Sequence, residues 1–201
     1  TSMNPFSLCP SYSALAKLPF DERVAQLRRP EVRARLLSEV PNDTSNILYT
    51  LGRKFERIFA LGDPPDYEPP LEASVASLAK RHGLTPEEIA YDLLLERNGR
   101  GLLFHTLTNY PHFNLDGMLD MLQHKDTLIG LGDGGAHYGL ICDASYSTFL
   151  LSYWTRDRRG AKLSLPWVIK AMSRDTAAAV GLNDRGLLAP GYKADMNVID
   201  F

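Results

Sequence analysis

The sequence predicts an α/β protein in which amphipathic helices alternate with short apolar strands. Apolar residues recur at helical spacing through residues 72–98, and two short apolar runs, 101–105 and 127–131, each follow a helical segment. A chain that alternates helices with short buried strands is typical of parallel βα units. Its 201 residues suffice for one domain of ordinary size or two small ones.

Composition narrows the class of protein further. The hydrophobic fraction is 44% and the charged fraction 23%, which is the balance of a soluble globular protein with a core. The net charge of −2 and the lack of a basic block argue against a nucleic-acid partner. No apolar run approaches the ~18 residues of a membrane span, and no signal peptide is visible. Two distant cysteines make no disulfide framework, so we expect a reducing, cytoplasmic location.

The first half of the chain is predicted to begin with an ordered loop. Residues 1–20 are rich in Pro, Ser and aromatic side chains, and the chain starts at Thr1, as expected of a piece of a longer protein or of a cloning remnant. Short helices are predicted from Asp21 and from Pro30, where proline suits a first helical turn. The run 57–61 is a candidate strand before a proline-rich loop.

Capping patterns locate the later helices. A helix is predicted at 72–82, and Thr85-Pro-Glu-Glu88 carries a capping box that starts the next. A further helix follows Asn114, an apolar stretch at 149–154 is expected to be helical, and Ser164 starts the clearest periodic pattern. The tail 186–200 is predicted to form a turn and a final strand.

A glycine-rich turn at the end of the run 127–131 holds the main candidate for chemistry. Gly130, Gly132 and Gly135 match the dinucleotide pattern G-x-G-x-x-G, but no helix is predicted to begin there, and the distant acid Asp157 lies in a charged segment. Asp133, in the same turn, has two other interpretations. It is either a turn residue that bonds its own backbone or a catalytic carboxylate at the carboxyl end of a strand.

Four segments favour the catalytic interpretation by resemblance. They are Asn-Pro-Phe-Ser at 4–7, Gly-Asp-Gly-Gly-Ala-His at 132–137, Cys-Asp-Ala-Ser-Tyr at 142–146 and Asp-Arg-Gly-Leu-Leu-Ala-Pro-Gly-Tyr-Lys-Ala-Asp at 184–195. Together they resemble the carboxyl-terminal half of the D-aminoacylase, or N-acyl-D-amino-acid deacylase, branch of the amidohydrolase superfamily. The resemblance covers this whole chain but part of the length of a family member.

The resemblance implies the carboxyl-terminal part of a (β/α)₈ TIM-barrel. Residues 1–181 would be its last, incomplete set of βα units, and 182–201 would supply the last strand of a small accessory β-domain. The implied activity is zinc-dependent hydrolysis of a small-molecule N-acyl amide, for example an N-acyl-D-amino acid. Asp133 matches the carboxylate that contacts zinc or lies beside it and takes a proton from the metal-bound water.

The chain departs from the family in its histidines. The family grips zinc with a His-x-His pair, and no two histidines here are two residues apart; they are His82, His105, His112, His124 and His137. A catalytic zinc takes about three protein ligands, so most of the metal site is expected to be missing and this chain alone to be inactive. We expect a missing amino-terminal half or self-association to complete the barrel. The alternative is a non-catalytic binding or assembly module.

Secondary candidates lie near the same predicted strand ends. His137 is a candidate substrate or metal contact, and His105 is either a substrate contact or a hydrogen-bonded rim residue. The segment 106–110 is a candidate pocket lining. Cys142 and Asp143 are equally explained as a packed thiol and a helix cap.

Overall fold

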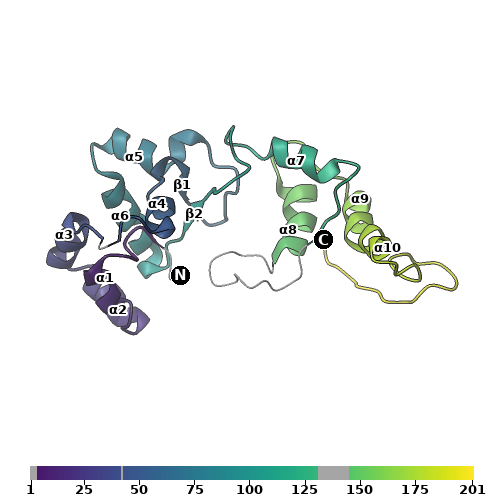
Figure 1. The fold of residues 1–201 in the computed structure, drawn as a ribbon, viewed down its shortest axis with the longest axis horizontal. Helices are drawn as coiled ribbons and strands as arrows, with labels where there is room; N and C mark the ends of the chain where they lie inside the picture. Colours follow the sequence, from purple (N-terminus) through teal and green to yellow (C-terminus); the bar gives the residue numbers. More distant parts are fainter. Residues whose placement is uncertain (1–3, 42, 131–144) are drawn as a thin grey trace. The chain divides into compact units, whose positions relative to one another are not determined.

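A computed structural model describes residues 4–41, 43–130 and 145–201 of the chain. The chain divides into two compact units, Thr1–Leu115 and Asp116–Phe201 (Figure 1), called here unit 1 and unit 2. The boundary predicted at residue 181 concerns another division, between barrel and β-domain, and stays a prediction.

Three short helices open unit 1. They are α1 (Pro10–Leu15), α2 (Phe20–Leu27) and α3 (Pro30–Ser38). The helices predicted from Asp21 and Pro30 are confirmed, whereas the prediction of a loop throughout residues 1–20 is wrong. Pro10 begins α1. Proline suits this position because it lacks a backbone N–H, and the N–H groups of the first helical turn have no partner within the helix.

The first core cluster lies beneath these helices. Phe6, Cys9, Leu36 and Tyr91 are all buried and pack together. The Phe6 and Tyr91 rings meet edge to face, with centroids 5.3 Å apart. The apolar side chains near the amino terminus are therefore anchored by a residue of the later helix α6 (Pro86–Gly99).

Capping side chains fix the middle of unit 1. Asn46 caps α4 (Ile47–Gly52), which leads through η1 (Phe55–Arg57) into strand β1 (Ile58–Ala60). After η2 (Leu71–Ala73), Ser74 caps α5 (Val75–His82), and Gly83 ends this helix with a left-handed φ of 66°. Helix α5 thus begins three residues later than predicted.

Helix α6 carries the predicted capping box. The backbone N–H of Glu88 donates to Thr85 Oγ1 over 3.2 Å, and the backbone N–H of Thr85 donates to Glu88 Oε2 over 2.8 Å. The segment 96–98 departs from helical geometry before Gly99. A second core cluster of Phe55, Ile58, Val75 and Ala90 joins α5 and α6 to β1.

The strands predicted at 57–61 and 101–105 form a two-stranded antiparallel sheet. The parallel βα pattern was predicted from the runs 101–105 and 127–131, and no pairing between these two runs is found among the described residues. Strand β2 (Leu103–His105) pairs antiparallel with β1, with Phe59 opposite Phe104 and Ile58 opposite His105. Two helices, α5 and α6, connect these strands. A connection through one helix usually brings the chain back to start a parallel strand. Here a second helix reverses the direction of the chain once more, and β2 runs antiparallel to β1.

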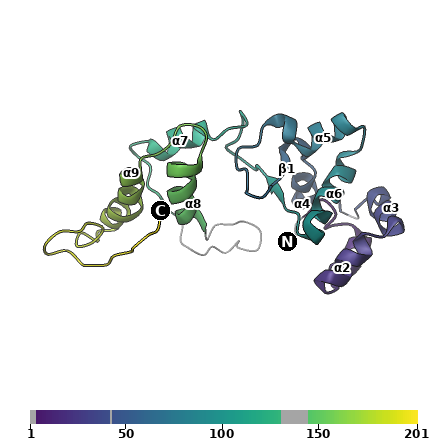
Figure 2. The same cartoon turned by 180° about the vertical axis from the view of Figure 1, so that it is seen from behind.

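Unit 2 consists of helices in the part that the structure describes. They are α7 (Asp116–Gln123), α8 (Tyr146–Ser152), the π-helical η4 (Tyr153–Asp157), α9 (Leu165–Lys170), the π-helical η5 (Ala171–Asp175) and α10 (Thr176–Ala179). Figure 2 shows the same helices from behind. Helices α8 and α9 contact each other, and Ser164 caps α9 as predicted.

Two further predicted strands are not found among the described residues. Residues 127–130 and the tail 182–201 carry no ladder pairing. A strand requires a partner for its backbone groups, and no partner strand for either segment is found among the described residues. Helices and a two-stranded sheet nevertheless make a mixed α/β structure, in agreement with the predicted class at that level. None of the described helices has the length and apolar character needed to cross a membrane.

Candidate functional site

The carboxyl end of β2 places His105 among buried groups of unit 1. The imidazole is half-buried, and its Nε2 is fully buried with no hydrogen-bond partner among the described residues. Burial lowers the pKa of His105, the positive charge of Lys54 lowers it further, and Glu56 opposes both effects. The neutral imidazole is therefore favoured, with one buried nitrogen available to a polar group.

Thr106 fixes the backbone directly after His105. Its backbone N–H donates to the carbonyl oxygen of Arg57 over 3.0 Å, and its Oγ1 donates to the same oxygen over 3.3 Å. Thr106 is itself buried. The register of β1 and β2 is thus extended by one residue, and the His105 backbone is held on both sides.

The guanidinium of Arg57 fixes the loop that follows. Its Nη1 donates to the carbonyl oxygen of Tyr110 over 2.5 Å, and its Cζ lies 4.7 Å from the centroid of the Phe113 ring. The Phe113 ring in turn meets the rings of Phe59 and Tyr110 edge to face. The Arg57 side chain therefore connects the segment before β1 to the loop after β2.

Tyr110 serves as a structural donor in this loop. Its buried hydroxyl donates to the carbonyl oxygen of Pro69 over 3.0 Å. Burial raises the pKa of Tyr110, and the negative charges of Glu68 and Asp66 raise it further. Tyr110 is thus held protonated and is unsuited to act as a general base.

Two residues of the loop adopt left-handed backbone conformations. Asn109 has a φ of 58° and Phe113 a φ of 56°. Asparagine tolerates this region, but phenylalanine adopts it at a cost of order 1–3 kcal/mol. The Arg57 and Phe59 contacts with Phe113 offset that cost, so the loop after His105 is held in a defined shape.

The principal predicted site residues, Asp133 and His137, lie outside the described residues. Cys142 and Asp143 also lie outside them, in the segment 131–144. Their roles and their grouping with His105 stay predictions. His105 itself is placed at the end of a strand, as its position in the sequence predicted.

The resemblance implies a zinc site, and the described side chains do not supply one. Among residues 4–41, 43–130 and 145–201, no three His, Cys, Asp or Glu side chains group closely enough to hold a metal ion. His124 Nδ1 lies 3.9 Å from Asp126 Oδ2, but both side chains are exposed and make a pair rather than a ligand set. The described part of the chain therefore does not fit a catalytic zinc, which requires about three protein ligands.

Comparison with known proteins identifies the family. A family model described as "Amidohydrolase family" matches residues 2–201. The chain belongs to the amidohydrolase family. No curated protein and no solved structure matches it. The superfamily inferred by resemblance is confirmed at this level, and membership in the amidohydrolase family makes hydrolysis the parent activity.

Sequence reasoning missed Arg57 as a site-building residue. Arg57 was assigned to a strand, whereas its side chain reaches a carbonyl 53 positions away. A contact between segments so distant in sequence leaves no local pattern. The available signal was a cation at the start of an apolar strand, which needs a partner when it is drawn toward a core.

Proposed function

We propose that the chain is the carboxyl-terminal part of an amidohydrolase barrel that hydrolyses N-acyl amide bonds. The substrate class is an N-acyl amino acid of the D series, as in the D-aminoacylase branch that the sequence resembles. One observation carries the proposal: the family match spans residues 2–201 and includes the glycine turn with Asp133. The (β/α)₈ architecture of the whole protein is part of the same proposal.

Asp133 acts as the proton shuttle in this mechanism. Its carboxylate accepts a proton from a water molecule as the water oxygen attacks the carbonyl carbon of the amide. When the C–N bond breaks, the same proton passes to the leaving nitrogen. The products are a carboxylic acid and an amine, which become a carboxylate and an ammonium at neutral pH, and the carboxylate of Asp133 is regenerated.

Zinc in the parent enzyme would supply Lewis-acid activation of the water. The described residues do not hold such an ion, so its remaining ligands are assigned to the missing amino-terminal half or to a partner chain. Asp133 is the ligand that this chain would contribute. The chain in isolation is accordingly expected to show little hydrolysis.

His105 and His137 are proposed as substrate contacts. The support for His105 is its neutral imidazole, with a buried Nε2 that has no partner among the described residues. A neutral imidazole can donate to a carbonyl oxygen or accept from an amide N–H. Neither role requires a charge in the site.

Amide hydrolysis by the parent protein tests the proposal. N-acetylated amino acids of both series would be assayed with added zinc, comparing the unaltered protein with Asp133→Asn. The asparagine preserves shape but cannot accept the proton, so the expected loss in kcat is 10²–10⁴-fold. Asp120→Asn is the matched control, because Asp120 is an exposed carboxylate on α7.

Each result of this assay has one meaning. Asp120→Asn should retain full activity. Turnover by Asp133→Asn at the rate of the unaltered protein would remove Asp133 from the mechanism. If the protein hydrolyses another amide but none of the N-acyl amino acids, the proposed hydrolase activity is retained and the proposed substrate class is overturned.

A second candidate is a non-catalytic binding or assembly module. It is favoured by exposed apolar side chains in the tail of unit 2, namely Leu187, Leu188, Met196, Val198, Ile199 and Phe201. Apolar surface of this kind is typical of an interface. Stoichiometric zinc in the purified protein supports the enzyme, whereas its absence supports the module or a fragment that lacks most of the metal site. A mass above that of the monomer on size exclusion would support self-association.

A further inference from the structure

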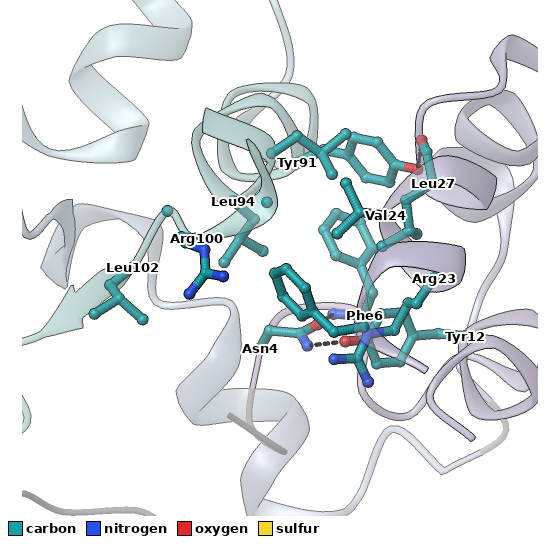
Figure 3. A pocket seen from close by; sticks show the side chains of 14 residues that line it. Asn4, Phe6, Tyr12, Arg23, Val24, Leu27, Tyr91, Leu94, Arg100 and Leu102 are labelled. Carbon is teal, nitrogen blue, oxygen red and sulfur yellow. Dashed lines mark hydrogen bonds between the residues drawn. The ribbon is translucent and has the colours of Figure 1, made fainter. Parts of the chain in front are cut away.

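Unit 1 contains a pocket that the candidate catalytic residues do not use. It has a volume of about 260 Å³ and lies between α2, the end of α6 and the segment around Asn4 and Tyr12. Figure 3 shows the lining side chains, with Arg23 and Arg100 both labelled. The pocket contains neither His105 nor the predicted glycine turn.

Two guanidinium groups share one aromatic ring at this pocket. The Cζ of Arg23 lies 5.7 Å from the centroid of Phe20, and the Cζ of Arg100 lies 5.3 Å from the same centroid. Arg23 also donates from Nη1 to the carbonyl oxygen of Ala16 over 3.2 Å. Within the described part of the chain, neither guanidinium lies within 4.0 Å of a carboxylate.

The charge of the pocket is consequently one-sided. Its lining includes Arg23 and Arg100 but no Asp or Glu. Two like charges repel, and the attraction of each to the shared Phe20 ring offsets the repulsion only in part. A bound anion would neutralise both, and the planar fork of an arginine matches a carboxylate in particular.

The walls of the pocket are apolar. They include Val24, Leu27, Leu94 and Leu95. Two polar groups nearby already have partners: Asn4 Nδ2 donates to Tyr12 Oη over 2.8 Å, and Tyr91 Oη donates to the carbonyl oxygen of Leu27 over 2.7 Å. The interior therefore favours an apolar body, while the arginines favour an anionic head.

We propose that this pocket binds a free, small organic carboxylate with an apolar body. The carboxylate pairs with Arg23 and Arg100, and the apolar body packs against Val24 and Leu94. A concave, largely apolar site with few convergent polar groups is the usual form of a small-molecule site. The proposal is independent of the proposed hydrolase activity, because the pocket uses none of its residues.

Calorimetric titration of the full chain tests the ligand class with three probes. Octanoate carries both required features, octanol lacks the charge, and acetate lacks the apolar body. Octanoate should bind at least roughly tenfold more tightly than either of the others, since a charge-assisted hydrogen bond and the burial of several CH₂ groups each contribute that much. Raising the salt concentration should weaken the binding of octanoate and leave the binding of octanol unchanged.

Substitutions test the location. Arg100→Gln and Arg23→Gln should each weaken octanoate binding roughly tenfold, while Arg35→Gln, which removes an equal charge from the exposed face of α3, should not. Leu94→Trp, which fills the pocket without changing its charge, should also weaken binding. Octanoate binding that survives both arginine substitutions overturns the proposal. If a variant fails to fold, equal binding of octanoate and octanol to the unaltered chain overturns it equally.

Discussion

Arg158 Nη2 donates to Asp116 Oδ1 over 2.6 Å, joining the residue that follows the π-helical segment η4 to the first residue of α7. The Arg158 side chain is fully buried, whereas that of Asp116 is 65% exposed. Arg158 also donates from Nη1 to the carbonyl oxygen of Ala161 over 2.5 Å, and its Cζ lies 4.9 Å from the Trp154 ring. A buried cation thus organises unit 2 around a partly exposed carboxylate.

Replacing Asp116 with alanine should lower the free energy of unfolding of unit 2. The change removes a charged partner while the guanidinium stays buried, which costs about 1–3 kcal/mol. Chemical denaturation followed by tryptophan fluorescence measures the loss, because Trp154 lies beside Arg158. Asp120→Ala, on the same helix with an exposed side chain, is the control and should change stability by less than about 0.5 kcal/mol.

Helix starts were the most predictable part of the fold. The signals at Thr85 and Ser164 are complete in the sequence, because a cap is formed by residues two or three positions apart. Local chemistry therefore suffices to place α6 and α9. The same holds for Pro30 at the start of α3.

Strand pairing was not predictable from the same signals. The apolar runs at 57–61 and 101–105 were identified as strands, but their antiparallel pairing depends on how α5 and α6 return the chain between them. The run 127–130 has the composition of a strand without a ladder in the described structure. Apolar composition indicates burial, whereas pairing requires a partner elsewhere in the fold.

The functional residues also differ in how far the sequence predicts their positions. The position of His105 at the end of β2 followed from the apolar run before it. The arginine pair at Phe20 did not, because Arg23 lies on α2, Arg100 follows the end of α6 77 positions later, and the two form no motif. Such clusters are created by packing.

Gly99→Ala should destabilise unit 1 through a steric clash as well as through backbone strain. Gly99 has a φ of 80°, and a Cβ placed there would lie 2.4 Å from Val24 Cγ2. Strain alone costs roughly 1–2 kcal/mol, and moving the buried Val24 adds to it. The measurement is the midpoint of urea denaturation.

Gly83→Ala separates the two contributions. Gly83 has a similar φ of 66°, but no atom lies within 4 Å of the Cβ position. Gly83→Ala should therefore show the strain without the clash and be less destabilising than Gly99→Ala. Equal losses of stability in the two variants would show that the Val24 side chain moves aside without an energetic cost. Adding Val24→Ala to Gly99→Ala should then recover none of the stability.

The depressed pKa of His105 predicts a pH dependence of stability. Burial, the largest cause, disfavours the imidazolium in the folded state. Its contribution to folding is complete above the unfolded-state pKa of about 6.5 and declines as the pH falls toward the lower folded-state pKa, because the unfolded chain then binds the extra proton. Unfolding free energies measured from pH 7.5 to pH 5 should fall more steeply for the unaltered chain than for His105→Gln, which cannot titrate.

His82→Gln, at the exposed end of α5, is the control and should retain the steep slope. Parallel slopes for the unaltered chain and His105→Gln would contradict the half-buried, neutral imidazole on which the proposed substrate contact depends.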